Sequence, residues 1–328
     1  MKFGAPLTAG NVFRSADRAW LVALLATGLL VAAVADAQSL YKYRGGDGEW
    51  MFSDRPPADA RAVETRELAT EAASPTVAVA HRLQEDRISL RASNTYYAPV
   101  ELVLGIDELR NIEKPAPDQP LRFVLPARGE TELMNLALTN ETADAPTIRY
   151  RYTWIVGDPT SLHSPDTPYR APFAVARSHP ISQAFPSALT HSTADSRYAI
   201  DIVMPIGTGV YAARAGTVFQ VASQNFRSGL DVERDGPAAN LVRILHSDGT
   251  YAEYAHLNWN SIRVRPGDAV RRGEYIADSG NTGFTSGPHL HFAVLRNRGM
   301  GTESVPIVFE GPNGSERAPE TGNTLSAY

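Results

Sequence analysis

The sequence contains no cysteine. A chain without thiols has no disulfide scaffold, no thiolate nucleophile, no iron–sulfur cluster and no cysteine-built zinc knuckle. Any metal site in this chain must therefore be made of histidine, aspartate or glutamate.

The sequence also lacks a strong excess of charge of either sign. It has 31 Lys+Arg against 36 Asp+Glu and a formal net charge of -5. Such mild acidity offers no broad electrostatic footprint for nucleic acid, so we expect no nucleic-acid partner. With 43% hydrophobic and 20% charged residues among 328, the composition is that of a globular protein, and this length suggests about two domains.

One long uncharged run stands out near the N-terminus, where residues 20–35 read WLVALLATGLLVAAVA. Basic residues precede it, and the small-x-small pattern Ala35-Asp36-Ala37 follows it. This order predicts a secretory signal peptide over residues 1–37, and hence a protein of the periplasm or cell envelope. A buried core helix and an uncleaved anchor are the alternatives, although the run is shorter than the roughly 20 residues of a bilayer span. We expect contact with the membrane only if the segment stays uncleaved.

Residues 38–57 predict a β-hairpin, because aromatic-rich alternating segments flank the turn sequence Gly45-Gly46-Asp47-Gly48. This stretch resembles the start of a short bacterial envelope module of unknown function, through its Tyr41-Lys42-Tyr43 strand and its Ser-Asp-Arg-Pro ending. Residues 58–74 are rich in Ala, Glu and Arg without a clear apolar face. We predict a linker or a short exposed helix there.

Short runs that alternate apolar and polar residues fill residues 75–158, separated by turn residues. The runs are residues 87–91, 100–104, 121–125, 131–138 and 148–156. This spacing predicts a small antiparallel β-sandwich, for which an immunoglobulin-like arrangement is one form. Tyr150, Tyr152 and Trp154 would share one strand face. Core or inter-domain packing is favoured for them over a sugar- or peptide-stacking surface, and a sandwich that binds wall or membrane is a further option.

The rest of the chain predicts a second all-β domain between two irregular segments. Residues 159–180 are rich in proline and predict an extended connector. Residues 181–308 are dense in Val, Ile, Tyr and Gly, which predicts tight antiparallel hairpins. Residues 309–328, rich in Gly, Pro, Ser, Glu and Asn, predict a disordered tail. The fold class is therefore all-β throughout.

Chemistry-bearing residues gather in this second domain. In His289-Leu290-His291 the two imidazoles would project from the same side of a strand, because side chains at i and i+2 share a face. Asp201 lies between apolar neighbours on another predicted strand, and a carboxylate in such a place needs a partner, for which a metal is one choice. His256 ends a third alternating strand.

Four sequence segments contain or adjoin these residues, and their order along the chain is characteristic. They read YAIDIVMPIGTGVYAARAGTV, HSDGTYAEYAHL, VRPGDAVRRGEYIADSGNTG and SGPHLHF. Residues 181–308 thereby resemble the lysostaphin-type, or LytM-type, zinc metalloendopeptidases that cut peptide cross-links of bacterial cell wall. The resemblance implies an antiparallel sheet of the duplicated hybrid motif type, one Zn²⁺ ion, and peptidoglycan peptides as substrate.

The resemblance further implies a role for each residue of the motif. Asp201 and His291 would be zinc ligands, and His256 and His289 would flank the attacking water and the scissile carbonyl. Catalytic zinc takes three protein ligands, lowers the pKa of a bound water and polarises a carbonyl. One imidazole can act as general base while the other stabilises the developing oxyanion. The sequence leaves open which of the two does which.

One position departs from the pattern. The usual third ligand is a histidine four residues before the aspartate, and Arg197 occupies that position. A guanidinium is always charged and has no lone pair for zinc. We predict that the loop before it folds back, so that His191, Asp201 and His291 bind the metal. In the alternative, His191 is an ordinary loop residue and the domain is a non-hydrolytic relative that activates other cell-wall hydrolases, with envelope proteins as partners.

We favour the enzyme, because a domain without catalysis has little reason to keep three imidazoles around one aspartate. The remaining histidines carry no functional prediction. For His246, before a hairpin turn, partial burial or a turn hydrogen bond is expected, and surface positions are expected for His81, His163 and His179. Asn240 could line the cleft or be an ordinary strand residue, and Arg197 could bind a substrate carboxylate or face solvent.

Overall fold

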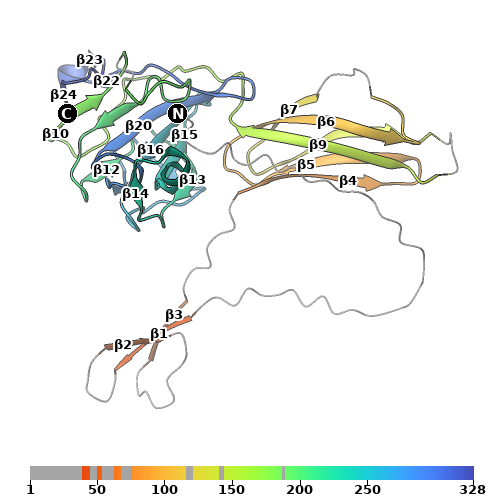
Figure 1. Cartoon of the computed structure of the whole chain (residues 1–328), viewed down its shortest axis with the longest axis horizontal. Coiled ribbons are helices and arrows are strands. Elements are labelled where there is room, and N and C mark those ends of the chain that lie inside the picture. The colour runs from red at the N-terminus through yellow and green to blue at the C-terminus, as the bar shows by residue number, and fades with distance from the viewer. Residues whose placement is uncertain are drawn as a thin grey trace. The chain divides into compact units, whose positions relative to one another are not determined.

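The computed structural model divides into two units (Figure 1). Described are residues 75–115, 121–139, 144–186 and 189–328, together with the backbone of three short strands at 39–44, 50–53 and 63–67. The predicted signal peptide lies outside these residues. Within the described part of the chain, no helix is long and apolar enough to cross a membrane.

The N-terminal unit contains an antiparallel sheet with the order β2-β1-β3. Its strands are β1 (Ser39–Arg44), β2 (Trp50–Ser53) and β3 (Val63–Glu67). The β1–β2 pair is the predicted hairpin. The prediction of a linker or helix over residues 58–74 is wrong at β3, which pairs with the free edge of β1. A third strand is favoured there because a two-stranded hairpin alone is marginally stable and leaves its edge groups unpaired.

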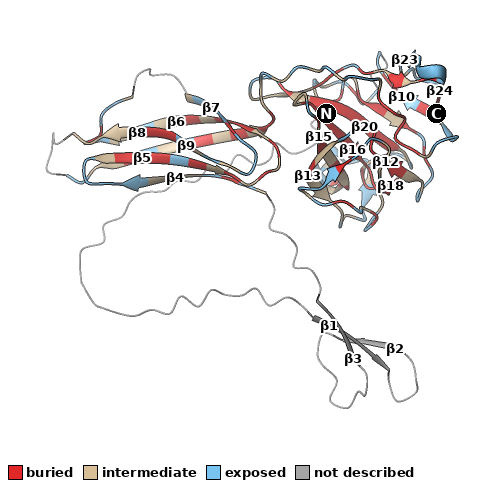
Figure 2. Ribbon diagram, turned by 180° about the vertical axis from the view of Figure 1, so that it is seen from behind, coloured by how far each residue is buried: buried red, intermediate tan, exposed pale blue. Residues whose placement is uncertain are grey.

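The second unit begins with a β-sandwich made of two three-stranded antiparallel sheets. The sheet orders are β4-β5-β8 and β7-β6-β9, with β4 (Val77–Leu83), β5 (Arg87–Asn94), β6 (Val100–Arg110), β7 (Leu121–Leu125), β8 (Glu130–Ala137) and β9 (Thr147–Val156). Each predicted run corresponds to a strand, and β4 adds one more. Leu90, Leu102 and Leu125 are fully buried between the sheets. Tyr152 and Trp154 lie in the same core. Figure 2 shows buried stretches along the sandwich strands.

The remainder of this unit is built on a nine-stranded sheet of order β17-β13-β15-β16-β20-β11-β10-β24, with β21 on β20. The strands are β10 (Ser178–Gln183), β11 (Ile200–Ile202), β13 (Gly216–Ala222), β15 (Leu241–Leu245), β16 (Tyr251–Ala255), β17 (Ala269–Val270), β20 (Leu290–Asn297), β21 (Thr302–Ser304) and β24 (Thr324–Ser326). Its ladders are antiparallel.

Smaller elements surround this sheet. They are β12 (Gly209–Tyr211), β14 (Ser228–Gly229), α1 (Val232–Asp235), η1 (Gly236–Ala238), β18 (Tyr275–Asp278), β19 (Gly283–Phe284), β22 (Phe309–Glu310), η2 (Pro312–Gly314) and β23 (Glu316–Arg317). The β12–β18 and β22–β23 pairs are antiparallel, whereas β14 and β19 run parallel. The predicted all-β architecture is confirmed.

Alternation along β11 and β20 places apolar residues on one face of the sheet and the aspartate and histidine of the motif on the other. Ile200, Ile202, Leu290 and Phe292 are fully buried in one core. The intervening residues point to the opposite face, because successive strand side chains alternate. The register places Asp201 of β11 directly opposite His291 of β20. Period-2 alternation therefore brings Asp201 and His291 together on one sheet face, which farther along β20 also carries the buried residues Ala293 and Leu295.

The predicted limits of this domain were too narrow on both sides. Tyr169 and Phe173, in the predicted connector, are buried in its core with 1% and 0% exposure. The predicted disordered tail is wrong, because β24 pairs with β10 and buries Leu325 in the same core. Apolar side chains from both flanking segments therefore complete the core, although the composition of these segments predicted a connector and a tail.

The docking of the C-terminal strand can be tested with two single substitutions. Leu325 is 6% exposed and Tyr328 is 55% exposed. Leu325→Ala should lower the free energy of unfolding by about 2 to 3 kcal/mol, because it removes buried methyl groups and leaves a cavity. Tyr328→Ala, the matched control, should leave it unchanged within about 0.5 kcal/mol. Equal urea unfolding curves for the two variants would show that β24 is not docked.

Candidate active site

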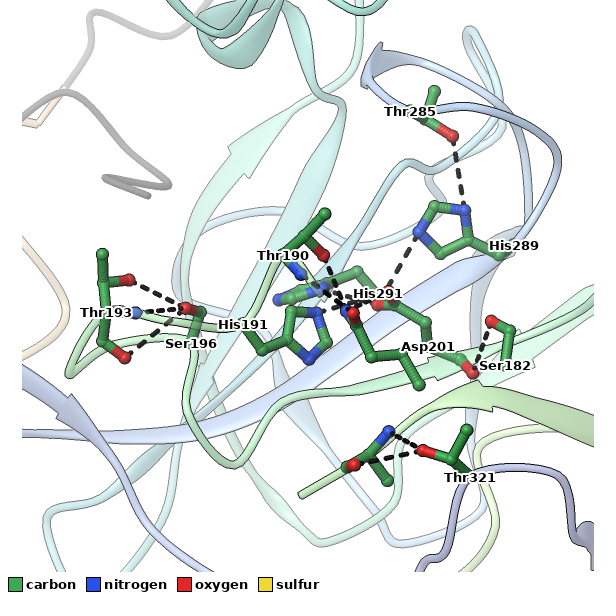
Figure 3. A network of polar contacts seen from close by, with 12 residues as sticks. Ser182, Thr190, His191, Thr193, Ser196, Asp201, Thr285, His289, His291 and Thr321 are labelled. Carbon is green, nitrogen blue, oxygen red and sulfur yellow. Dashed lines mark hydrogen bonds and ion pairs between the residues drawn. The ribbon is translucent and has the colours of Figure 1, made fainter. Parts of the chain in front are cut away.

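The Asp201 carboxylate lies at the centre of the candidate site, and its side chain is only 13% exposed. His291 Nδ1 lies 2.9 Å from Asp201 Oδ1, a hydrogen bond across the β11–β20 ladder. His289 Nε2 lies 3.7 Å from the same oxygen. Figure 3 shows His191, His289 and His291 gathered around this carboxylate.

His191 reaches the carboxylate from a loop. Its Nε2 lies 3.3 Å from Asp201 Oδ2, and its ring centroid is 5.1 Å from that of His291. One ligand atom from each of His191, Asp201 and His291 lies within 4.8 Å of the others. The loop therefore folds back as predicted, and the structure brings the three predicted ligands together. Ligation itself stays a prediction.

These three residues fit a divalent metal. Two imidazoles and one carboxylate form a donor set that catalytic zinc uses, with a fourth position left for water. The ring of His191 is also fully enclosed, and its Nδ1 has no hydrogen-bond partner among the described residues. The nitrogen of His191 that faces the carboxylate is Nε2, so Nε2 is the atom that a metal in this cluster would meet.

The loop that carries His191 is fixed by its own hydrogen bonds. Thr193 O accepts the backbone N–H of Arg197 at 2.9 Å, and the Thr193 and Ser196 hydroxyls lie 2.8 Å apart (Figure 3). Ala194 O accepts both the backbone N–H and the hydroxyl of Ser304 in β21, at 2.8 and 3.0 Å. The far end of the loop is thus tied to the sheet.

Arg197 lies outside the cluster. Its side chain is exposed, and its guanidinium carbon lies 5.4 Å from the Phe185 ring centroid and 5.7 Å from that of Tyr198. This geometry is a cation–π contact at the surface. The solvent-facing interpretation of Arg197 agrees with this placement, and the residue that occupies the family's ligand position takes no part in the site.

His289 presents a defined nitrogen to the centre. Its Nδ1 lies 2.8 Å from the Gly287 carbonyl, so Nδ1 carries the proton and donates it. In the neutral ring the lone pair then belongs to Nε2, which is the atom facing Asp201. The Thr285 hydroxyl lies 3.3 Å from the same Nδ1 (Figure 3).

His256 is held in the same way immediately after β16. Its backbone leaves the strand with a φ of 61°, a region uncommon for residues with side chains. The Nδ1–H donates to Thr282 O at 2.7 Å, and the ring centroid is 4.6 Å from that of His289. Burial, with the charges of His289 and His291, lowers the pKa of His256 to about 3. His256 is therefore neutral at ordinary pH.

Asp201 and His291 differ from His256, because the site favours the charged form of each of them. Burial alone would raise the pKa of Asp201, but hydrogen bonds from His191 and His291 hold it well below the ordinary value. Burial alone would lower the pKa of His291, but the hydrogen bond and charge of Asp201 raise it. The centre thus stabilises a carboxylate anion beside groups that supply positive charge.

Two supporting residues were not recognised as such from the sequence. Asn240, for which a cleft-lining or an ordinary strand role was open, is fully buried and bonds to the backbone of Asn225 and Leu257. Thr282 Oγ1 accepts the N–H of Asn240 and donates to Leu257 O, beside the carbonyl that holds His256. No local motif marks these contacts, because each joins distant segments.

Comparisons with known proteins agree with this location of the site. Residues 195–303 match the model of Peptidase family M23, and residues 28–81 match the model of a domain of unknown function, DUF4124. His191 therefore precedes the matched M23 stretch.

Curated relatives match over part of their length. Peptidoglycan DD-endopeptidase ShyA of Vibrio cholerae is 37% identical over 95 residues, 29% of this chain and 19% of that protein. Glycyl-glycine endopeptidase ALE-1 of Staphylococcus capitis is 27% identical over 132 residues, 39% of this chain and 33% of that protein. The matches to such relatives thus span a third of their length or less.

A solved structure also matches part of the chain. The catalytic domain of lysostaphin from Staphylococcus simulans is 27% identical, with a TM-score of 0.27, over 36% of this chain and 79% of that chain.

His246 lies outside the cluster and gives a pH-dependent prediction. It is buried, its Nδ1–H donates to Ala215 O at 2.8 Å, and burial lowers its pKa to about 4. The unfolded chain binds a proton near pH 6.5, whereas the native ring stays neutral until about pH 4, so stability falls as pH falls between these values.

As pH falls from 8 to 5, protonation of His246 in the unfolded chain should lower the free energy of unfolding by about 2 kcal/mol. His246→Asn removes this titrating group. The variant should therefore lose about 2 kcal/mol less unfolding free energy than the wild type between pH 8 and pH 5. Chemical unfolding of the metal-free chains at several pH values measures the difference. Parallel pH profiles would show that His246 is not a buried neutral ring.

Proposed function

We propose that this chain is a zinc-dependent endopeptidase that hydrolyses peptide cross-links of peptidoglycan, since residues 195–303 match Peptidase family M23. The observation that carries the proposal is the cluster of His191, Asp201 and His291, which could hold a metal ion although Arg197 occupies the usual first position. The printed names of relatives, a peptidoglycan DD-endopeptidase and a glycyl-glycine endopeptidase, support a peptide substrate from cell wall.

His191, Asp201 and His291 would hold the metal, and the rest of the site would move protons. When bound, zinc acidifies a water molecule and polarises a peptide carbonyl. The low pKa of the Asp201 carboxyl keeps it anionic and able to bind a cation. The deeply buried ring of His191 cannot turn away to solvent, since its side chain is 1% exposed.

His256 and His289 would be the proton carriers. Backbone carbonyls hold the Nδ1 proton of each ring, so both rings offer an Nε2 lone pair. One Nε2 can accept the proton of the attacking water, and that proton can then pass to the leaving amine. The other ring, when its Nε2 carries a proton taken up from solvent, can donate a hydrogen bond to the carbonyl oxygen and stabilise the negative charge there. The side chain of His289 is 15% exposed and His256 is 1% exposed, so His289 is the more accessible to substrate.

We also propose that the chain is exported to the periplasm or cell envelope. The support is the basic, apolar and small-x-small order of residues 1–37. An uncleaved anchor is the alternative, and N-terminal sequencing of the protein purified from its envelope fraction distinguishes the two. A mature terminus at Gln38 is the expected result.

A non-hydrolytic activator of other cell-wall hydrolases is the second candidate function. Arg197 favours it, because the family's first ligand position is lost there. Such a protein would bind an envelope partner and would release no muropeptides from purified peptidoglycan. Zinc content together with muropeptide release by the wild-type chain distinguishes the two functions.

The assignment of the third ligand predicts opposite results at two neighbouring positions. His191→Ala should weaken zinc binding by at least about tenfold and lower peptidoglycan cleavage by about 10² or more, because only two protein ligands remain. Arg197→Ala, the matched control on the same loop, should keep both. Zinc content after dialysis and muropeptide release measure the two effects. Unchanged zinc binding in His191→Ala would remove His191 from the ligand set.

The proton carriers predict a separation of binding from catalysis. His256→Gln and His289→Gln should each retain stoichiometric zinc, because neither ring belongs to the ligand set. Each should lower kcat/KM for a cross-linked muropeptide by about 10² to 10⁴, the range for removal of a general acid or base. Full activity in either variant would contradict the role of that ring, and loss of zinc would instead make it a ligand.

A further inference from the structure

Gln183 is a buried glutamine at the edge of the metal cluster. It is the last residue of β10, is 4% exposed, and pairs with Asp201 of β11 after a shift in the strand register. The amide of a buried glutamine has no access to bulk water, so its oxygen and nitrogen must find hydrogen-bond partners within the protein. The partners of Gln183 therefore indicate what the residue does.

The orientation of the amide follows from its partners. The backbone N–H of Thr190 can only donate, so the atom 3.0 Å from it is the Gln183 carbonyl oxygen. The amide nitrogen then donates to Asp201 Oδ2 at 3.1 Å and to Thr190 Oγ1 at 2.7 Å. One side chain therefore bonds both to the carboxylate and to the residue that precedes His191.

We propose that Gln183 is a positioning residue for the metal centre: it sets the carboxylate of Asp201 and the loop ligand His191 relative to each other. His291 occupies Asp201 Oδ1, and Gln183 and His191 share Oδ2. Hydrogen bonds to metal-ligating groups orient them and tune their affinity. The inference rests on the proposed function, since it concerns the same cluster.

The need for such a residue arises from where the third ligand lies. Asp201 and His291 are fixed by the backbone ladder of adjacent strands. His191 comes from a loop, and ordering a loop costs conformational entropy. Ser304 ties the far end of that loop at Ala194, and Gln183 ties its near end at Thr190. The loop histidine is thus held from both sides.

The test compares two neighbouring substitutions in the full-length chain. Gln183→Met keeps the length of the side chain but removes its hydrogen-bonding groups. Ser182→Ala is the matched control, because exposed Ser182 donates only to the backbone carbonyl of Asp201, at 3.2 Å. Zinc affinity is measured by competition with a chromophoric chelator, and the Co²⁺ absorption spectrum reports the geometry of the site.

Gln183→Met should bind zinc about tenfold to a hundredfold more weakly, the range for loss of an outer-shell partner. Its Co²⁺ spectrum should shift, and excess zinc should restore muropeptide release. Ser182→Ala should match the wild type in all three. Thermal unfolding should show a larger loss for Gln183→Met in the zinc-loaded form than in the metal-free form.

The outcomes separate this inference from the proposed function. Equal zinc affinity in Gln183→Met and wild type, with equal losses of Tm in both forms, would make Gln183 merely structural and overturn the inference alone. A wild type that binds no zinc would overturn both. If Gln183→Met does not fold, Thr190→Val takes its place. Thr190→Val removes the 2.7 Å hydrogen bond from the Gln183 amide nitrogen to Thr190 Oγ1 and should weaken zinc binding several-fold. Unchanged zinc affinity in this variant would overturn the inference.

Discussion

The site depends on one carboxylate held on a sheet face. Asp201 projects from the central strand β11, and its side chain is 13% exposed. A charge so placed is costly unless several groups compensate it. Here His191, His291 and Gln183 bond to it and His289 faces it. The buried negative charge needs polar partners close to it. The imidazoles of His191 and His291, together with the carboxylate itself, form a donor set that suits a cation.

The predicted third ligand, His191, lies on a loop, whereas Asp201 lies on β11 and His291 on β20. Arg197 cannot ligate, and its guanidinium instead packs at the surface against Phe185 and Tyr198. The imidazole comes from a loop that is tied down at both ends, through Thr190 and Ala194. A ligand on a loop demands more supporting contacts than a ligand on a strand. The buried glutamine beside the aspartate supplies part of that support.

Much of this architecture follows from the two-residue period of strands. Alternation predicted the sandwich strands and placed His289 and His291 on one face of a strand. It failed where burial depends on distant partners. Leu325 and Phe173 lie in short segments without a strand-like alternation, and only the tertiary fold shows that they complete a core. The contacts of Gln183 were equally hidden, because it bonds to segments that no local pattern connects to it.

The measurement that tests the central claim most directly is a crystal structure of the full-length chain loaded with zinc. We predict one zinc ion bound by an imidazole nitrogen of His191, a carboxylate oxygen of Asp201 and an imidazole nitrogen of His291, each at about 2.0 to 2.2 Å. His256 and His289 should remain outside bonding distance. Zinc held by Asp201 and His291 with His191 turned away, or no zinc in the cluster at all, would contradict the predicted ligand set.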